Sequence, residues 1–188
     1  MSVLKAPVTS RDHIIGPAYA PVTVVEYGDY QCPYCAMAHP NVKQLLRLRG
    51  DDVRLIFRHF PLTEVHPLAL PAAETAEFAG AYGQFWPMHD AIYSNSTELS
   101  LPLLMVLCAG LGLDSDKLQE ALALGTYRPA IQAYFIGGVH SGVNGTPCFF
   151  VNGVRHDGGY DLAELVAAVD AAHAAVTEAP NGRRSAQA

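Results

Sequence analysis

Residues 22–35 read VTVVEYGDYQCPYC, an apolar run that ends in two cysteines three positions apart. The run from Val22 to Tyr30 is rich in β-branched residues and predicts a strand, and a helical pattern follows from Tyr34 to Arg49. This junction places Cys32 at the N-cap of the helix and Pro33 at the first helical position, where proline fits because no intrahelical N–H is needed there.

A helix N-terminus stabilises a thiolate, because unpaired backbone N–H groups and the positive end of the helix dipole face it. We therefore expect Cys32 to be the reactive thiol. Cys35 lies one helical turn later on the same side of the helix, so the two sulfurs can close a disulfide. The motif predicts a pair that cycles between dithiol and disulfide, and the alternative is an inert buried pair.

The chain has 188 residues, of which 50% are apolar, so it can bury a core without disulfide bonds. One domain with an insertion is the expected organisation. Four cysteines are too few for a secreted disulfide framework of this size. We therefore expect Cys32 and Cys35 to be the cysteines that take part in chemistry, and Cys108 and Cys148 to be packing residues.

Charge and hydropathy exclude two classes of partner. The net charge is −6, and the largest basic cluster is Arg183-Arg184, so we expect no nucleic-acid partner. The most apolar segment, Leu99 to Leu113, is too short to cross a bilayer of roughly 30 Å and is expected to be a core helix. Residues 1–13 contain no continuous apolar stretch, so the sequence predicts no secretory signal and a cytoplasmic protein.

The remaining pattern predicts an α/β fold in the order strand, helix, strand, helical block, hairpin, helix. Val53 to Arg58 alternates as a second strand, expected to run parallel to the first. Asn152-Gly153 is typical of a type I′ hairpin turn, and Asp161 with Glu164 predicts a capping box for the last helix. The expected segments are an irregular lead-in at 1–20, the first part of the fold at 21–65, an insertion of three or four helices at 66–143, the second part of the fold at 144–177 and a disordered tail at 178–188.

This order, with CxxC at the first strand-to-helix junction, resembles the thioredoxin fold, and the long helical insertion resembles that of the DsbA-like thiol-disulfide oxidoreductases. The resemblance runs from about residue 12 to residue 175. Its specific marks are Glu26 six residues before Cys32, the CPYC motif, Phe85-Trp86 with His89-Asp90, and Gly145-Thr146-Pro147.

The resemblance implies a role for each of these positions. Cys32, the exposed cysteine of the pair, attacks, and Cys35, deeper in the helix, resolves the mixed disulfide. Pro147 matches a cis-proline beside the cysteine pair, with an ordinary trans proline as the alternative, and the backbone of Thr146 pairs with an extended substrate segment. Glu26 matches a buried acid that relays protons to the resolving thiol.

Other readings of these positions stay open. Glu26 is alternatively a strand-end carboxylate paired with an arginine such as Arg58. Pro33 and Tyr34 are expected to tune the reduction potential of the cysteine pair. Tyr34 supplies no positive charge, so we expect a less oxidising couple than in the strong oxidants of the family. The alternative is that Tyr34 is only a surface aromatic residue. Cys148 is expected to be a buried, unreactive thiol rather than a third redox cysteine.

The predicted reaction needs no organic or metal cofactor. Its substrates are protein or peptide cysteines, and glutathione or a thioredoxin-type reductase restores the pair. The Gly158-Gly159 turn before Asp161 is similar to the glutathione-binding turn of glutaredoxins, although a simple capped turn is the preferred reading. Two rival functions remain: a redox-gated sensor or adaptor that binds a partner through the helical insertion, and a zinc site built from Cys32, Cys35 and two histidines among His39, His59, His66 and His89.

Overall fold

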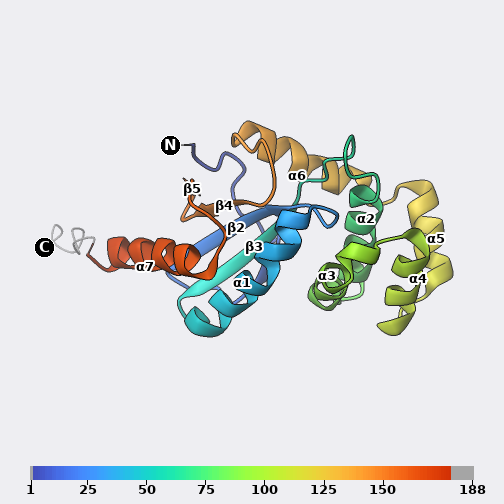
Figure 1. Cartoon of the computed structure of the whole chain (residues 1–188), viewed down its shortest axis with the longest axis horizontal. Helices are drawn as coiled ribbons and strands as arrows, with labels where there is room; N and C mark the ends of the chain where they lie inside the picture. The colour runs from blue at the N-terminus through green and yellow to red at the C-terminus, as the bar shows by residue number, and fades with distance from the viewer. Residues whose placement is uncertain (1, 179–188) are drawn as a thin grey trace, which may run out of the picture.

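A five-stranded sheet forms the centre of the computed structural model, which describes residues 2–178 (Figure 1). The strand order is β1-β3-β2-β4-β5, which confirms the predicted α/β class. The strands are β1 His13–Ile15, β2 Val22–Gly28, β3 Val53–His59, β4 Cys148–Val151 and β5 Val154–His156.

The first half of the fold is a β-α-β unit. Strands β2 and β3 pair in parallel, and helix α1, Pro33–Arg49, makes the crossover between them. The register places Glu26 opposite Phe57 and Tyr27 opposite Arg58. Because side chains alternate along a strand, Glu26 and Arg58 therefore lie on opposite faces of the sheet.

Each face of the sheet carries its own apolar core. On one face, residues of β2, β3 and β4 pack against α1 and α7, which runs from Leu162 to Glu178. On the other face, Val25, Tyr27 and Phe150 pack beneath α6, Arg128–His140, and the N-terminal segment (Figure 1). The two faces thus place functional side chains in separate surroundings.

The segment between β3 and β4 contains more helices than the three or four predicted. Within residues 2–178 it holds five α-helices and one 3₁₀ helix. Positive φ angles at Gly83, Gly112 and Gly125 mark three of the breaks between helices, because glycine adopts this conformation without steric cost. The elements that precede α6 are α2 Ala69–Ala81, α3 Phe85–Ser94, η1 Ser96–Glu98, α4 Leu101–Gly110 and α5 Ser115–Leu124.

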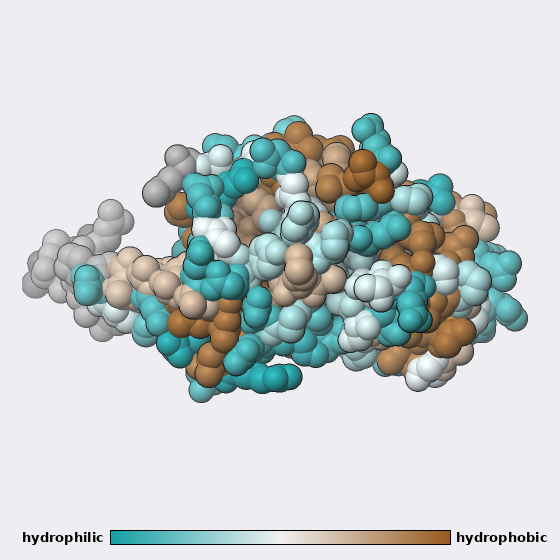
Figure 2. Space-filling view, viewed as in Figure 1, coloured by the Kyte–Doolittle hydropathy of each residue, from teal (hydrophilic) through white to brown (hydrophobic). Residues whose placement is uncertain are grey.

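Helix α4 differs from the core helix expected over 99–113. It is shorter, and of its residues only Leu104 and Cys108 are buried, whereas Val106 is 65% exposed. Apolar side chains gather on the surface of this part of the molecule (Figure 2). The reason is that α4 lies at the outside of the insertion, where neighbouring helices cover one side of it only. No helix within the described range has the length and apolarity to cross a membrane.

The N-terminal lead-in is more ordered than predicted. Residues 13–15 form β1, which pairs antiparallel with β3, and Val3 bridges to Val154. The buried guanidinium of Arg58 donates to both oxygens of Asp12, at 2.7 and 3.1 Å, and to the backbone carbonyls of Ala6 and Pro7. A buried arginine must have all its donors paired, so it holds this segment against the sheet.

The C-terminal part starts with the predicted hairpin. Asn152 and Gly153 both have positive φ between β4 and β5. Asp161 caps α7, because its side chain accepts a hydrogen bond from the Glu164 N–H at 3.1 Å. The predicted capping box also requires the Glu164 carboxylate to accept from the Asp161 N–H. That carboxylate instead accepts from the Gly159 N–H, so the box is not closed. Of the predicted tail, Glu178 ends α7 and residues 179–188 lie outside the described residues.

Candidate active site

The two motif cysteines lie at the start of α1, as the sequence predicts. Cys32 is the N-cap in extended conformation, and Pro33 occupies the first turn. No side chain caps the helix at this end, so the first backbone N–H groups face the Cys32 sulfur. Both cysteines are free thiols in this structure.

Hydrogen bonding makes Cys32 an acidic thiol. The strongest effect is a hydrogen bond from the Cys35 side chain to the Cys32 sulfur, and Thr146 and the backbone N–H groups of Tyr34 and Cys35 add to it. Together they outweigh burial, which acts in the opposite direction, and lower the pKa of Cys32 from 9.0 to about 5. Cys32 is therefore a thiolate at neutral pH, the form that is nucleophilic.

Cys35 has the opposite property. It is fully buried, and burial raises its pKa well above 9.0, with a further rise because it donates to Cys32. The pair therefore consists of one thiolate and one protonated thiol. Such a division suits a mechanism in which one sulfur attacks first and the other follows.

The segment at Thr146 and Pro147 lies against the cysteine pair. The Cys32 sulfur lies 3.3 Å from the Thr146 carbonyl oxygen, to which it donates when protonated, and the Thr146–Pro147 peptide bond is cis. Cys32 is only 3% exposed, less than the open position that the family resemblance implies, because it packs within the core cluster at the base of the insertion. The buried Thr146 hydroxyl forms no hydrogen bond with a group other than Cys32 within residues 2–178, so it is free to donate to the thiolate.

Glu26 lies at the sheet, buried beneath the motif. Burial raises the pKa of its carboxyl group from 4.5 to about 8, and its charge raises the pKa of Cys35. The alternative pairing with Arg58 is wrong, because Arg58 lies on the other face of the sheet and binds Asp12. Glu26 thus has the protonation behaviour that a proton relay near neutral pH requires.

The other predicted residues divide between surface and core. Pro33 and Tyr34 are exposed, with Tyr34 57% accessible. Cys148 is buried on the sheet face opposite the cysteine pair, and burial raises its pKa, as expected for an unreactive thiol. Cys108 is buried in the insertion, where burial raises its pKa as well.

Asp29 is a functional residue that the sequence reasoning did not identify. One of its carboxylate oxygens accepts from the N–H groups of Gln31 at 2.8 Å and Cys32 at 3.2 Å. The other binds the Leu62 N–H at 2.9 Å and the His66 ring at 2.8 Å. The local signal for the first pair was an aspartate two residues before Gln31, which is typical of an Asx turn, whereas the second pair is non-local.

Residues of α3 form hydrogen bonds with the loop before Cys32 and with strand β1. Tyr30 and His89 are both buried, and the Tyr30 hydroxyl is hydrogen-bonded to the His89 Nδ1 at 2.9 Å. Of the residues that carry the family resemblance, His89 is therefore hydrogen-bonded to the loop before Cys32, and Trp86 donates to the Ile14 carbonyl at 3.2 Å. The insertion is thus tied to the site by side-chain hydrogen bonds.

In the glycine turn before α7, the Gly159 N–H is not free to bind a glutathione carboxylate. The Gly159 N–H is bound by Glu164, and its carbonyl accepts from His156 at 2.9 Å. The structure thus favours the simple capped turn.

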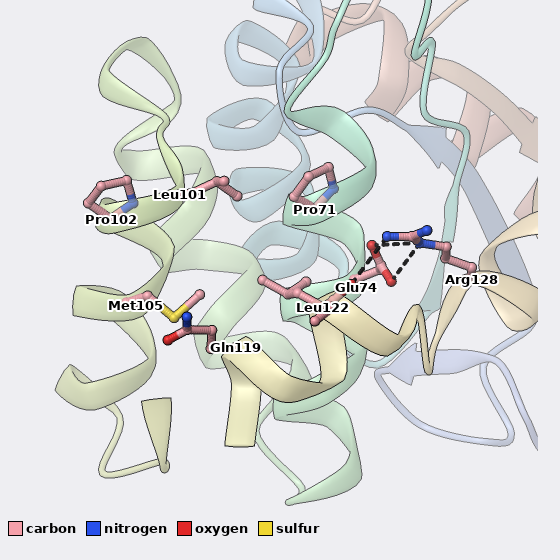
Figure 3. Close-up of a pocket in the computed structure, with 9 residues that line it drawn as sticks. Pro71, Glu74, Leu101, Pro102, Met105, Gln119, Leu122 and Arg128 are labelled. Carbon is pink, nitrogen blue, oxygen red and sulfur yellow. Dashed lines mark hydrogen bonds and ion pairs between the residues drawn. The ribbon is translucent and has the colours of Figure 1, made fainter. Parts of the chain in front are cut away.

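A separate hollow of about 480 Å³ lies in the insertion between α2, α4 and α5 (Figure 3). Its walls are mostly apolar, and the buried carboxylate of Glu74 lies at its edge, paired with Arg128 at 3.2 Å. Neither cysteine of the motif lines it.

Within the part of the chain that the structure describes, two groups of three side chains could hold a metal ion, and neither includes a cysteine.

Comparison with known sequences gives one family match and several relatives. The sequence model of a family described as thioredoxin matches residues 8–171. A protein named Na(+)/H(+) antiporter NhaA 1 from Salinispora arenicola is 47% identical over 174 residues, which are 93% of this chain and 26% of that protein. A protein of the same name from a Mycobacterium species is 35% identical over 86% of this chain and 27% of its own length. The chain thus spans about a quarter of the length of these curated relatives.

Solved structures share the fold. BdbD from Bacillus subtilis superposes with a TM-score of 0.81 at 21% identity, covering 92% of this chain and 98% of BdbD. Wolbachia pipientis α-DsbA1 gives 0.80 at 23% identity, over 93% and 96% of the two chains. A thioredoxin-like oxidoreductase from Silicibacter pomeroyi gives 0.73 at 28% identity, over 87% and 93%. The predicted resemblance to DsbA-like proteins is confirmed at the level of the fold.

Replacing Asp29 tests the loop that carries Cys32. Asp29→Ala leaves the N–H groups of Gln31 and Leu62 without their acceptor, so we expect the free energy of unfolding to fall by about 2–4 kcal/mol in urea denaturation. Asp161→Ala, which removes an exposed helix cap, is the control and should cost about 1 kcal/mol. Equal losses in the two variants would contradict the central position given to Asp29.

The acidity of Cys32 is measurable by alkylation. The rate of reaction of the reduced protein with iodoacetamide should rise with pH around a midpoint of about 5 and be level by pH 7, because the thiolate alone reacts. Thr146→Val removes a hydroxyl that stabilises the thiolate and should move the midpoint to higher pH, whereas Thr177→Val on α7 should not. A midpoint near 9.0 in the unmodified protein would contradict the assignment.

Proposed function

This chain belongs to the thioredoxin family, and from this premise we propose that it is a DsbA-like thiol-disulfide oxidoreductase that exchanges disulfides with protein or peptide cysteines. The observation that carries the proposal is the division of acidity within the Cys32–Cys35 pair. A thiolate with a pKa of about 5 lies next to a protonated thiol, beside a peptide segment that can receive a substrate.

The proposed reaction proceeds in two exchanges. The Cys32 thiolate attacks one sulfur of a substrate disulfide, a mixed disulfide forms, and the other substrate sulfur leaves as a thiolate. Cys35 then loses its proton, attacks the Cys32 sulfur and releases the second substrate thiolate. The protein ends as the Cys32–Cys35 disulfide, and the substrate has gained two electrons and takes up two protons.

Glu26 is proposed to accept the proton of Cys35 in the second exchange. Its pKa of about 8 leaves it partly ionised near neutral pH, and its effect on the pKa of Cys35 indicates that the two groups interact. The reverse reaction, in which a substrate thiol attacks the Cys32–Cys35 disulfide, uses the same groups. Substrate is expected to pair with the backbone at Thr146, next to Pro147.

The direction of electron flow depends on the compartment and on the reduction potential of the pair. We propose a cytoplasmic protein that rests mainly as the dithiol and acts as a reductase, restored by glutathione or by a thioredoxin-type reductase, with no organic or metal cofactor in the exchange itself. Tyr34 brings no positive charge to the pair, which agrees with a couple of moderate potential.

Equilibration of the pair against glutathione buffers tests the direction. A potential near that of thioredoxin, about −270 mV, supports a reductase, and one above about −150 mV indicates an oxidant. The proposal of an oxidoreductase itself is contradicted if the pair does not exchange with glutathione at all.

A redox-gated adaptor is the second candidate, because apolar side chains are exposed on the insertion around the hollow of Figure 3. In that function the cysteines would gate partner binding without turning over substrate. Slow reduction of a model protein disulfide, together with partner binding in one redox state only, would favour it over the enzyme.

Trapping of the intermediate distinguishes the two cysteines. Cys35→Ser should accumulate a mixed disulfide with a peptide substrate, because Cys32 still attacks and nothing resolves the product. Cys32→Ser should form none, because Cys35 is buried and protonated. Mass spectrometry of the alkylated mixture measures both, with Cys148→Ser as the control that should behave like the unmodified protein. Adducts on Cys148 would overturn the assignment.

Glu26 should make folding dependent on pH. Its pKa is higher in the folded protein than in the unfolded chain, so the folded state binds more protons between pH 4.5 and about 8, and this contribution to stability is lost as pH rises through that range. Glu26→Gln removes the ionisable group, so its stability relative to the unmodified protein should improve from pH 5 to pH 8 by a few kcal/mol in urea denaturation. Glu98→Gln, at an exposed position, should show no such trend.

A further inference from the structure

Three side chains that could ligate a metal ion meet where the sheet adjoins the helical insertion. His13 comes from β1, His59 from the end of β3 and Glu77 from α2. The Nε2 atoms of His13 and His59 lie 2.9 and 3.0 Å from the same oxygen, Oε1 of Glu77, and the three potential ligand atoms all lie within 4.8 Å of one another. In the sequence 64 positions separate the first of these residues from the last, so no local pattern joins them.

The cluster is largely enclosed. The side chains of His13, His59 and Glu77 are 18%, 1% and 12% exposed. One carboxylate therefore lies between two imidazole nitrogens, away from most of the solvent.

We propose that His13, His59 and Glu77 form a binding site for one divalent transition-metal ion of the zinc class. Two imidazoles with one carboxylate are a recurrent ligand set for zinc when a fourth position is left to water. Imidazole nitrogens do not suit calcium or magnesium, which take oxygen ligands. The carboxylate offsets part of the charge of the ion, as a buried cation requires.

The two imidazoles already lie close to the distance from Glu77 that zinc geometry requires. Bonds of about 2.0–2.1 Å at tetrahedral angles separate ligand atoms by about 3.3 Å, a few tenths of an ångström more than the separations between the imidazoles and Glu77. The imidazole of His13 stacks on Phe85 with centroids 3.5 Å apart, and that of His59 packs edge-on to Phe57 at 5.4 Å. Both rings are therefore held with Nε2 toward Glu77.

An entry path lies on the outer side of the cluster. Glu77 lines a hollow of about 380 Å³ together with Tyr134, Asp12 and Arg58. Two arginines line this hollow: Arg58 is neutralised by its ion pair with Asp12, and Arg11 is exposed to solvent. An ion and its water ligand can thus reach the Glu77 carboxylate from solvent.

The other group of three potential ligands is a weaker candidate. His39, His89 and Asp90 also lie within reach of one another. However, the ammonium group of Lys43 binds Asp90, and the Nδ1 of His89 is occupied by Tyr30. A cation at this second site would have to displace or approach the ammonium group of Lys43. Substitutions in the two groups are therefore expected to affect metal binding differently in the same titration.

A metal at the first site would join α2 to β1 and β3 without involving the cysteine pair. Binding to the folded state alone raises apparent stability in proportion to the logarithm of metal concentration. The site is therefore expected to strengthen the attachment of the helical insertion to the sheet.

Zinc titration of the Cys32→Ser/Cys35→Ser chain tests the proposal independently of redox activity, since this variant cannot exchange disulfides. We expect calorimetry to give one Zn²⁺ per chain and thermal unfolding to shift to higher temperature with zinc. Glu77→Gln and His13→Gln should each weaken binding at least tenfold and remove the thermal shift, whereas His39→Gln should leave both unchanged. Because Glu77→Gln keeps the shape of the side chain and His13 is partly exposed, circular dichroism is expected to show both variants folded.

Cobalt absorption identifies the ligands directly. Co²⁺ added to the unmodified chain and to the double serine variant should give the same d–d spectrum without a thiolate charge-transfer band. The proposal is overturned if neither protein binds zinc, if Glu77→Gln binds as tightly as its parent, if His39→Gln abolishes binding, or if cobalt binds only through thiolate.

Discussion

The geometry of the reactive thiol depends on one buried carboxylate. Asp29 has no solvent exposure at its side chain, and its two oxygens bind groups on both sides of it: the N–H groups of the turn into α1, and the Leu62 N–H with the His66 ring after β3. A buried charge of this kind is tolerated only when its hydrogen bonds are made, so the loop has one conformation. That conformation places Cys32 at the helix N-terminus, where its acidity originates.

Burial and hydrogen bonding then divide the chemistry among Cys32, Cys35 and Glu26, three groups at the junction of sheet and insertion. The drop in the pKa of Cys32 from 9.0 to about 5 corresponds to roughly 5 kcal/mol of preference for the thiolate. The same surroundings keep Cys35 protonated and Glu26 mostly protonated at neutral pH, because neither receives enough hydrogen bonds to offset burial. One face of the sheet therefore holds the groups of the proposed reaction, and the other holds Cys148 among apolar side chains.

The helical insertion contacts the sheet on its inner side and faces solvent on its outer side. At its inner side, buried contacts from His89 and Trp86 reach the loop and β1, and the His13–His59–Glu77 cluster joins α2 to two strands. At its outer side, α4 and α5 leave apolar side chains and a hollow exposed to solvent (Figures 2 and 3). The inner side supports the site, and the outer side exposes apolar side chains of α4 and α5, among them Val106 and Leu124.

Local pattern was enough to predict the β2-α1-β3 unit, Cys32 at the N-cap, the Asn152-Gly153 turn and the start of α7, because each depends on residues within a few positions of one another. The tertiary structure alone decided the pairing of β1, the low exposure of Cys32, the exposure of α4, the partners of Arg58 and the second pair of contacts of Asp29. Those features join segments that are far apart in the sequence, and no local periodicity records which segments meet. The histidines illustrate the difference: they are scattered in the sequence, and only the packing of α2 against the sheet brings His13 and His59 to Glu77.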